Sequence, residues 1–167
     1  MASAEPFRIC FVCWGNICRS PTAMAVMRAL VAEAGLSDRI TVDSAGTSAE
    51  HLGGPPDRRT LAEAQRRGMP LEHRAWQFRY ADFDRFDMVV AADETNARRL
   101  LRMARNDADR DKVRLLREFD PACAGGDFDV PDPYYGGASG FSDVYDLVEA
   151  ACRGLLAELQ RAAVSRD

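Results

Sequence analysis

The sequence has no apolar run long enough to cross a membrane and no excess of cationic residues. Its apolar segments, such as residues 88–92, are broken by charge well before the roughly 18 consecutive apolar residues that a membrane span needs. The first eight residues include Glu5 and no long apolar stretch, so they do not resemble a signal peptide. The formal net charge is −4, whereas affinity for nucleic acid needs clustered Lys and Arg. We therefore expect a cytoplasmic protein that binds neither membranes nor nucleic acid.

Histidine is scarce, and the cysteines lack the pairing that a metal site or a disulfide scaffold needs. The only histidines are His51 and His73, and there is no second Cys pair to complete the four ligands of a structural zinc site. The five cysteines are odd in number in a chain without an export signal, which excludes a disulfide scaffold. Walker A and Gly-x-Gly-x-x-Gly patterns are also missing. We therefore expect no metal and no cofactor.

Two of the cysteines, Cys10 and Cys13, form a Cys-x-x-Cys sequence, but a redox pair is not expected there. A thioredoxin-like pair needs both thiols at a helix N-terminus, whereas here the turn residues come only after Cys13. Cys10 lies inside the apolar run 8–13, where a small thiol packs as a hydrophobic residue. We expect Cys10 to belong to the core.

The length of 167 residues and the 47% hydrophobic composition fit one domain over residues 1–167. Strands and helices alternate along the chain with mostly short connections. This order predicts an α/β three-layer sandwich, in which a parallel sheet carries helices on both faces and a ligand binds at the carboxyl ends of the strands. Strands are expected at 7–12, 40–43, 88–92 and 113–116, and helices at 21–34, 57–67, 94–105 and 142–164, with loops at 46–56 and 117–140.

The turn after the first strand carries the most information about function. It runs from Cys13 through five residues to Arg19 and Ser20, and a helix follows at Pro21. Five residues can wrap backbone N–H groups around one tetrahedral oxyanion, and the helix N-terminus adds its partial positive charge at the same point. Gly15 allows a sharp turn close to the ligand, and Ser20 is predicted to cap the helix. The expected phosphate-binding loop comprises Trp14, Gly15, Asn16, Ile17, Cys18 and Ser20.

The residues at the two ends of this loop suit nucleophilic phosphate chemistry. Arg19 can hold two phosphate oxygens at once. The helix terminus and this cation favour the thiolate of Cys13, which is the form that attacks, and Ser20 can donate a hydrogen bond to it as it leaves. A proton donor is also needed, and Asp132, in a Pro-rich turn on a long connection, is our candidate. The adjacent Tyr134 and Tyr135 can form a wall against an aryl group.

These motifs together resemble the low-molecular-weight protein tyrosine phosphatases, and the actinobacterial members in particular. The resemblance rests on residues 12–21 and 132–135, with further matches at residues 43–46, 68–70, 73 and 93–96. It implies a four-stranded parallel sheet, no metal, and hydrolysis of phosphotyrosine through a cysteinyl-phosphate intermediate. Cys13 would then be the nucleophile, Arg19 the phosphate clamp, and Asp132 the general acid and then base.

The resemblance also implies supporting and regulatory roles. Asn16 would hold the loop through bonds to Ser44, Ser20 and His73. Cys18 would match a second cysteine that can form a disulfide with the nucleophile and protect it. Tyr134 and Tyr135 would be rim residues that a tyrosine kinase can phosphorylate, and tyrosine-phosphorylated proteins would be the substrates. Trp14 and the loop that carries His51 depart from many relatives, and we expect both residues at the substrate rim, where a larger wall would favour phosphotyrosine over phosphoserine.

Three other functions are compatible with parts of the pattern. Arsenate reductases share this fold and loop, but their relay needs two more thiols close together, and Cys123 and Cys152 are far apart in the sequence. A module that binds phosphotyrosine without cleaving it would not need Cys13, Arg19 and Asp132 all intact. A phosphatase for small aryl or acyl phosphates stays open, because the sequence specifies the phosphate better than what lies beyond it.

Overall fold

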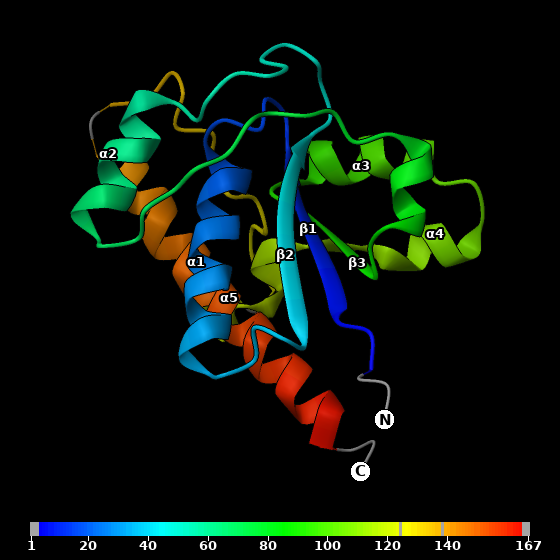
Figure 1. Cartoon of the computed structure of the whole chain (residues 1–167). Coiled ribbons are helices and arrows are strands. Elements are labelled where there is room, and N and C mark those ends of the chain that lie inside the picture. The colour runs from blue at the N-terminus through cyan, green and yellow to red at the C-terminus, as the bar shows by residue number, and fades with distance from the viewer. Residues whose placement is uncertain (1–3, 124, 138, 165–167) are drawn as a thin grey trace.

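Four parallel strands form the centre of the molecule, as the sequence predicts. The structure is a computed structural model, and it describes residues 4–123, 125–137 and 139–164. The strand order is β2-β1-β3-β4, so the first strand lies between two neighbours (Figure 1). All three pairings are parallel. The strands are β1 (Phe7–Cys13), β2 (Ile40–Gly46), β3 (Met88–Ala91) and β4 (Val113–Leu115).

Helices cover both faces of this sheet and complete the predicted three layers. Helices α1 and α5 pack together on one side, with α2 beside α5, while α3 and α4 lie on the other side against β3 and β4 (Figure 1). No helix in the described residues is long and apolar enough to cross a membrane. The helices are α1 (Arg19–Glu33), α2 (Arg58–Arg66), α3 (Glu94–Met103), α4 (Asp107–Lys112) and α5 (Gly140–Val164), and three 3₁₀ turns lie at η1 (Tyr80–Asp84), η2 (Leu116–Phe119) and η3 (Pro121–Cys123).

The central strand β1 is apolar because both of its faces are buried. Ile9 and Phe11 belong to the core beneath α1 and α5, whereas Cys10 and Val12 belong to the core on the other face. Cys10 is fully buried, so the prediction that it is a core residue is confirmed. Each apolar side chain buried in this way contributes about 1.5–3 kcal/mol. The strand is therefore a firm base for the residues that follow it.

The start of α1 differs from the prediction. The helix begins at Arg19 and its N-cap is Cys18, which makes no capping bond through its side chain, so the assignment of Ser20 as the cap was wrong. The loop of residues 14–18 ends at this N-cap, and helical geometry begins at Arg19. Pro21 is then the third helical residue, a position that it tolerates because the first four N–H groups of a helix have no partner within the helix.

Other strand and helix boundaries also differ from the predicted ones. Strand β2 extends to Gly46 because its last residues, small or polar, pair with the end of β1. The predicted loop after β4 contains η2 and η3. Helix α4 was missed, because its sequence has no apolar period. It is stabilised by Asn106, whose side chain accepts a hydrogen bond from the backbone N–H of Asp109.

The packing of α5 on η2 depends on a glycine. A β-carbon on Gly154 would lie 1.8 Å from the carbonyl oxygen of Phe119, so Gly154→Ala must push the helix away from η2. We expect this substitution to lower the free energy of unfolding by about 1–3 kcal/mol or more, measured by urea denaturation. Gly126→Ala is the control, because a β-carbon there meets nothing within 4 Å. Equal stability of the two variants would contradict this account of the contact.

Candidate active site

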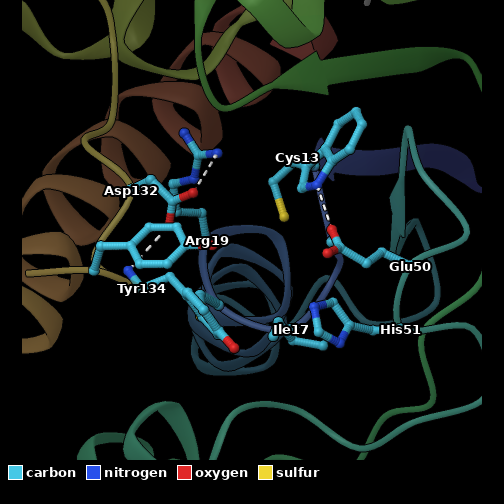
Figure 2. Close-up of a pocket in the computed structure, with 11 residues that line it drawn as sticks. Cys13, Ile17, Arg19, Glu50, His51, Asp132 and Tyr134 are labelled. Atoms are coloured by element: carbon cyan, nitrogen blue, oxygen red, sulfur yellow. Dashed lines mark hydrogen bonds and ion pairs between the residues drawn. The ribbon is translucent and has the colours of Figure 1, made fainter.

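A pocket of about 140 Å³ opens at the carboxyl end of β1. It gathers side chains from three separate segments of the chain. Figure 2 shows Glu50 and His51 on one side of the opening and Asp132 and Tyr134 on the other, with Cys13 and Arg19 between them. The lining consists of Cys13, Trp14, Gly15, Ile17, Cys18, Arg19, Glu50, His51, Asp132, Tyr134 and Tyr135.

The loop between β1 and α1 is held in shape by the side chain of Asn16. Asn16 is fully buried and has a φ of 57°, in the left-handed region that few residues other than glycine adopt. Its amide nitrogen donates hydrogen bonds to the hydroxyls of Ser20 at 2.8 Å and Ser44 at 3.0 Å. Its carbonyl oxygen accepts from the backbone N–H of Trp76 at 3.2 Å and lies 2.9 Å from Nε2 of His73. These contacts offset the cost of the unusual backbone conformation.

His73 completes this network as a neutral side chain. Burial lowers the pKa of His73 from its ordinary value of 6.5. Its Nε2 also lies 3.2 Å from the hydroxyl of Ser44. The backbone N–H of Trp76 fixes which way the amide of Asn16 points, and a neutral ring with its proton on Nε2 can donate to the same carbonyl oxygen. The amide nitrogen is then directed at the two serines.

The end of β2 holds the other side of the loop. The backbone N–H groups of Thr47 and Ser48 donate to the carbonyl oxygens of Cys13 and Trp14 at 2.8 and 3.1 Å. Gly46 makes this close approach possible, since a β-carbon there would lie 2.8 Å from the carbonyl oxygen of Trp14. The first two residues of the loop are thus fixed by backbone bonds.

The thiol of Cys13 lies at the base of the pocket next to a hydroxyl. Its Sγ is 3.0 Å from Oγ of Ser20, and the residue is only 3% exposed. Ser20 accepts a hydrogen bond from Asn16, so its single hydroxyl proton can go to the sulfur of Cys13 or to the carbonyl oxygen of Ala45, 3.3 Å away. Ser20 therefore interacts with the sulfur rather than with the first helical amides, which explains why it does not cap the helix.

Arg19 enters the same space from the first turn of α1. Its Nη1 donates to Asp93 at 2.7 Å and to the carbonyl oxygen of Val130 at 2.9 Å. Its Nη2 lies 3.7 Å from a carboxylate oxygen of Asp132. Burial alone would lower the pKa of Arg19, but the negative charges of Cys13, Asp93 and Asp132 outweigh burial and raise it. Of the three side-chain nitrogens of Arg19, only Nη1 makes hydrogen bonds to the described residues. Nε and Nη2 can therefore bind an anion.

Asp132 reaches the pocket although it lies far from the loop in sequence. The segment before it is attached to the sheet edge, because the N–H of Val130 donates to the carbonyl oxygen of Ala92 at 2.8 Å and the side chain of Asp129 accepts from the N–H of Glu94. Asp132 itself accepts from the N–H of Tyr134 at 3.1 Å. Its side chain is 46% exposed, so it can exchange protons with water at the pocket mouth.

Aromatic side chains surround the opening. The rings of Tyr134 and Tyr135 meet edge to face with centroids 4.8 Å apart, and His51 lies 6.3 Å from Tyr134 on the facing side. A β-carbon on Gly15 would lie 2.9 Å from the ring of His51, so this glycine leaves room for the rim. The indole N–H of Trp14 donates to Glu50 at 2.8 Å. The structure thus brings all four predicted rim residues to one opening.

Cys18 is the second thiol of the pocket. Burial raises the pKa of Cys18 to about 12, so this residue stays protonated near neutral pH. All five cysteines are free in this structure. Cys123 and Cys152 lie outside the pocket lining, and both are buried. This placement does not suit a relay of thiols starting at Cys13.

Sequence reasoning missed the roles of two residues at the site, Asp93, which pairs with Arg19, and Glu50, which lines the pocket. In the sequence Asp93 stands out only as part of the matching segment 93–96; in the structure it accepts from the N–H of Asn96 and also binds Arg19. The position of Asp93 just after β3 could have indicated a role at the site, because the carboxyl ends of parallel strands meet at one edge of the sheet. Glu50 carried no such signal, since it lies in an irregular loop.

The arrangement suits the capture and transfer of a phosphoryl group. A helix N-terminus and a buried guanidinium attract an oxyanion, a thiol lies at the base, and a partly exposed carboxyl stands at the mouth. The narrow opening between aromatic rings admits a flat group more readily than a bulky one.

Nearly the whole chain is similar to one family of small phosphatases. The family described as low molecular weight phosphotyrosine protein phosphatase matches residues 8–165. A low molecular weight protein-tyrosine-phosphatase of Streptomyces coelicolor is 52% identical over 160 residues, covering 96% of this chain and 98% of the relative. The human low molecular weight phosphotyrosine protein phosphatase is 40% identical over 157 residues, covering 93% and 98%. A protein tyrosine phosphatase structure from Entamoeba histolytica has a TM-score of 0.88 at 34% identity, covering 94% and 99%.

The neutral state of His73 makes the loop sensitive to acid. Because the folded-state pKa of His73 lies below its unfolded value of 6.5, its contribution to stability is complete above that pH and is lost as the pH falls below it. We expect the free energy of unfolding, measured with urea between about pH 7.5 and pH 5, to fall less steeply in His73→Gln than in the unsubstituted protein. His51→Gln, at the rim and outside the network, is the control and keeps the original slope. An unchanged slope in His73→Gln would refute this assignment.

Proposed function

The chain belongs to the low molecular weight phosphotyrosine protein phosphatase family and hydrolyses phosphotyrosine through a cysteinyl-phosphate intermediate, and we propose that Cys13, Arg19 and Asp132 carry out this reaction. The family membership predicted from the sequence motifs is confirmed. One observation carries the assignment of roles: the thiol, the guanidinium and the carboxyl line a single pocket at the N-terminus of α1. Tyrosine-phosphorylated proteins are the substrates that this family implies.

In the first step the phosphate lies in the loop with its oxygens on the backbone N–H groups and on Nε and Nη2 of Arg19. The thiolate of Cys13 attacks phosphorus, the S–P bond forms, and the bond from phosphorus to the tyrosine oxygen breaks. Asp132, protonated at this stage, gives its proton to the departing phenolate. The cation of Arg19, held by Asp93, stabilises the charge that builds on the equatorial oxygens.

In the second step water cleaves the phosphocysteine. Asp132, now a carboxylate, accepts a proton from the water, whose oxygen attacks phosphorus as the S–P bond breaks. The departing thiolate of Cys13 receives a hydrogen bond from Ser20, 3.0 Å away. Inorganic phosphate leaves, and Asp132 is protonated again for the next turnover. Asn16, Ser44 and His73 are positioning residues, because they act through Ser20 and the loop.

The rim sets the preference for the aryl group. Trp14 and His51 on one side and Tyr134 and Tyr135 on the other leave a slot into which a phenyl ring fits. A phosphoserine side chain is shorter, so its phosphorus would stay away from Cys13 when the peptide backbone rests on the rim. This argument favours phosphotyrosine over small or aliphatic phosphates.

The same pocket offers two means of regulation. Tyr135 is 91% exposed and Tyr134 is 36% exposed, so both are accessible to a tyrosine kinase, and a phosphate on either would place negative charge at the mouth. Oxidation of Cys13 by a peroxide gives the sulfenic acid, and the thiol of Cys18 can condense with it to a disulfide with release of water. The free state of all five cysteines suits the reducing cytoplasm, where we place the protein.

Substitution of the nucleophile and of the acid tests the mechanism. With an aryl phosphate in the presence of a chelator, we expect Cys13→Ser to abolish turnover, because a serine hydroxyl is not ionised at neutral pH. Asp132→Asn keeps the acceptor for the N–H of Tyr134 but has no proton to give, so kcat falls about 10²- to 10⁴-fold, most for poor leaving groups. The readouts are the steady-state rate and the trapped phosphoenzyme.

Asp127→Asn is the matched control in the same loop, since it also keeps its acceptor for the backbone N–H of Asp129. It is expected to retain the full rate. If the decrease in kcat of Asp132→Asn is the same for good and poor leaving groups, Asp132 is not the general acid. If Cys13→Ser still turns over substrate, Cys13 is not the nucleophile.

Removal of the indole wall tests the selectivity argument. We expect Trp14→Ala to lower the ratio of phosphotyrosine to phosphoserine turnover by roughly three- to tenfold, the value of one aromatic contact. Tyr80→Ala is the control, because Tyr80 is an exposed aromatic residue outside the pocket. If the ratio does not change in Trp14→Ala, the indole has no part in selectivity.

A further inference from the structure

The wall formed by Trp14 connects the pocket to a second helix. The guanidinium carbon of Arg99, in α3, lies 4.0 Å from the centre of the Trp14 ring, a typical cation–π geometry. The indole N–H is bound to Glu50, and the backbone carbonyl oxygen of Trp14 accepts from Ser48. The indole is therefore held in place, and it brings the positive charge of Arg99 next to the opening.

Arg99 is one of three arginines on the same side of α3. Arg98 and Arg102 are four residues apart and Arg99 and Arg102 three, so they are neighbours on the helix surface. The opposite side of the helix carries the buried Asn96 and Leu100. Arginines that look scattered in the sequence thus form one surface, which we term the α3 basic face and define as Arg98, Arg99 and Arg102.

The charge of the α3 basic face is not neutralised within the described part of the chain. No ion pair or side-chain hydrogen bond of the described residues involves any of its three arginines, whereas the nearby Arg105 is paired with both Asp84 and Asp109. Like charges at such spacings repel each other at a cost to the helix. The surface also stands out because the protein as a whole carries a formal charge of −4. An anionic partner would remove the repulsion.

We propose that the α3 basic face binds acidic residues that flank the phosphotyrosine of the substrate, an inference that rests on the proposed function. The phosphotyrosine enters past Trp14, and the adjoining peptide then runs beside Arg99. Arg102 lies about 4.5 Å further along the helix axis, and an extended peptide spans about 3.3 Å per residue, so Asp or Glu side chains within a few positions of the phosphotyrosine reach both arginines.

The carboxylates at the rim of the pocket favour one course for an acidic peptide over others. Glu50 is bound to Trp14, and Asp132 lies across the opening, so a peptide with acidic residues gains most when its carboxylates extend along α3 and away from these two groups. The helix lies on the face of the sheet opposite α1 (Figure 1), which gives the flanking peptide a course separate from the loop that binds phosphate.

The test compares two phosphotyrosine peptides of equal length, one with Glu on both sides of the phosphotyrosine and the other with Gln at those positions. The measured quantity is the ratio of their kcat/KM values. We expect the unsubstituted protein to favour the acidic peptide by about three- to tenfold at low salt, and the ratio to decrease as salt is added. In Arg98→Gln/Arg102→Gln the ratio falls toward one, and only the part that Arg99 supplies remains. This variant leaves Arg99 on Trp14, so the pocket wall is kept.

Arg39→Gln/Arg161→Gln is the matched control, since it removes two exposed positive charges outside the pocket and outside α3, and it keeps the preference. If both double variants lose the preference equally, overall charge rather than the α3 basic face is responsible and the inference is overturned. Equal turnover of the two peptides by the unsubstituted protein also overturns it, while the proposed function stands. Failure to cleave either peptide would instead contradict the proposed function.

Discussion

The side chain of Asn16 is the contact on which the pocket depends. Its residue has a backbone conformation that side chains rarely adopt, and four polar groups surround its buried amide. A backbone turned in this way directs successive N–H groups at one point, which is what an oxyanion needs. Loss of the amide would leave the conformation strained and the surrounding polar groups without partners. The shape of the loop and the phosphate binding that we propose for it therefore depend on the same contacts.

The remaining groups are placed by the carboxyl edge of the sheet. Cys13 ends β1, Asp93 follows β3, and the segment before Asp132 is attached to Ala92 by a backbone bond. Arg19 connects these parts, since it contacts Asp93 directly and Asp132 across 3.7 Å. A buried guanidinium requires such compensation, and the same carboxylates that stabilise it also orient it. The stability of the site and the orientation of its cation arise from the same ion pairs.

Segments with a clear apolar period, bounded by turn residues, were predicted well from the sequence. Segments whose structure depends on contacts with distant parts of the chain were not. The alternation of strands and helices predicted the fold class, which is confirmed, and the thiol, arginine and proline after β1 predict the phosphate-binding loop. Ser20 was misassigned as the helix cap because a serine before a proline is a common cap, although the sequence also indicates its hydrogen bond to Cys13. Helix α4 and the role of Glu50 depend on neighbours in space, and no local pattern encodes them.

Apart from α4, the sequence by itself determined the order of the main strands and helices, because apolar periodicity marks them along the chain. It also indicated the family and the chemistry of the loop, because these follow from spacing along short stretches of chain. The tertiary structure decided what surrounds that loop. It placed Asp93 and Asp132 on either side of Arg19 and set Arg99 of α3 over the ring of Trp14. These relations join segments that are distant in sequence, and such contacts form only when the chain packs and its charges find partners.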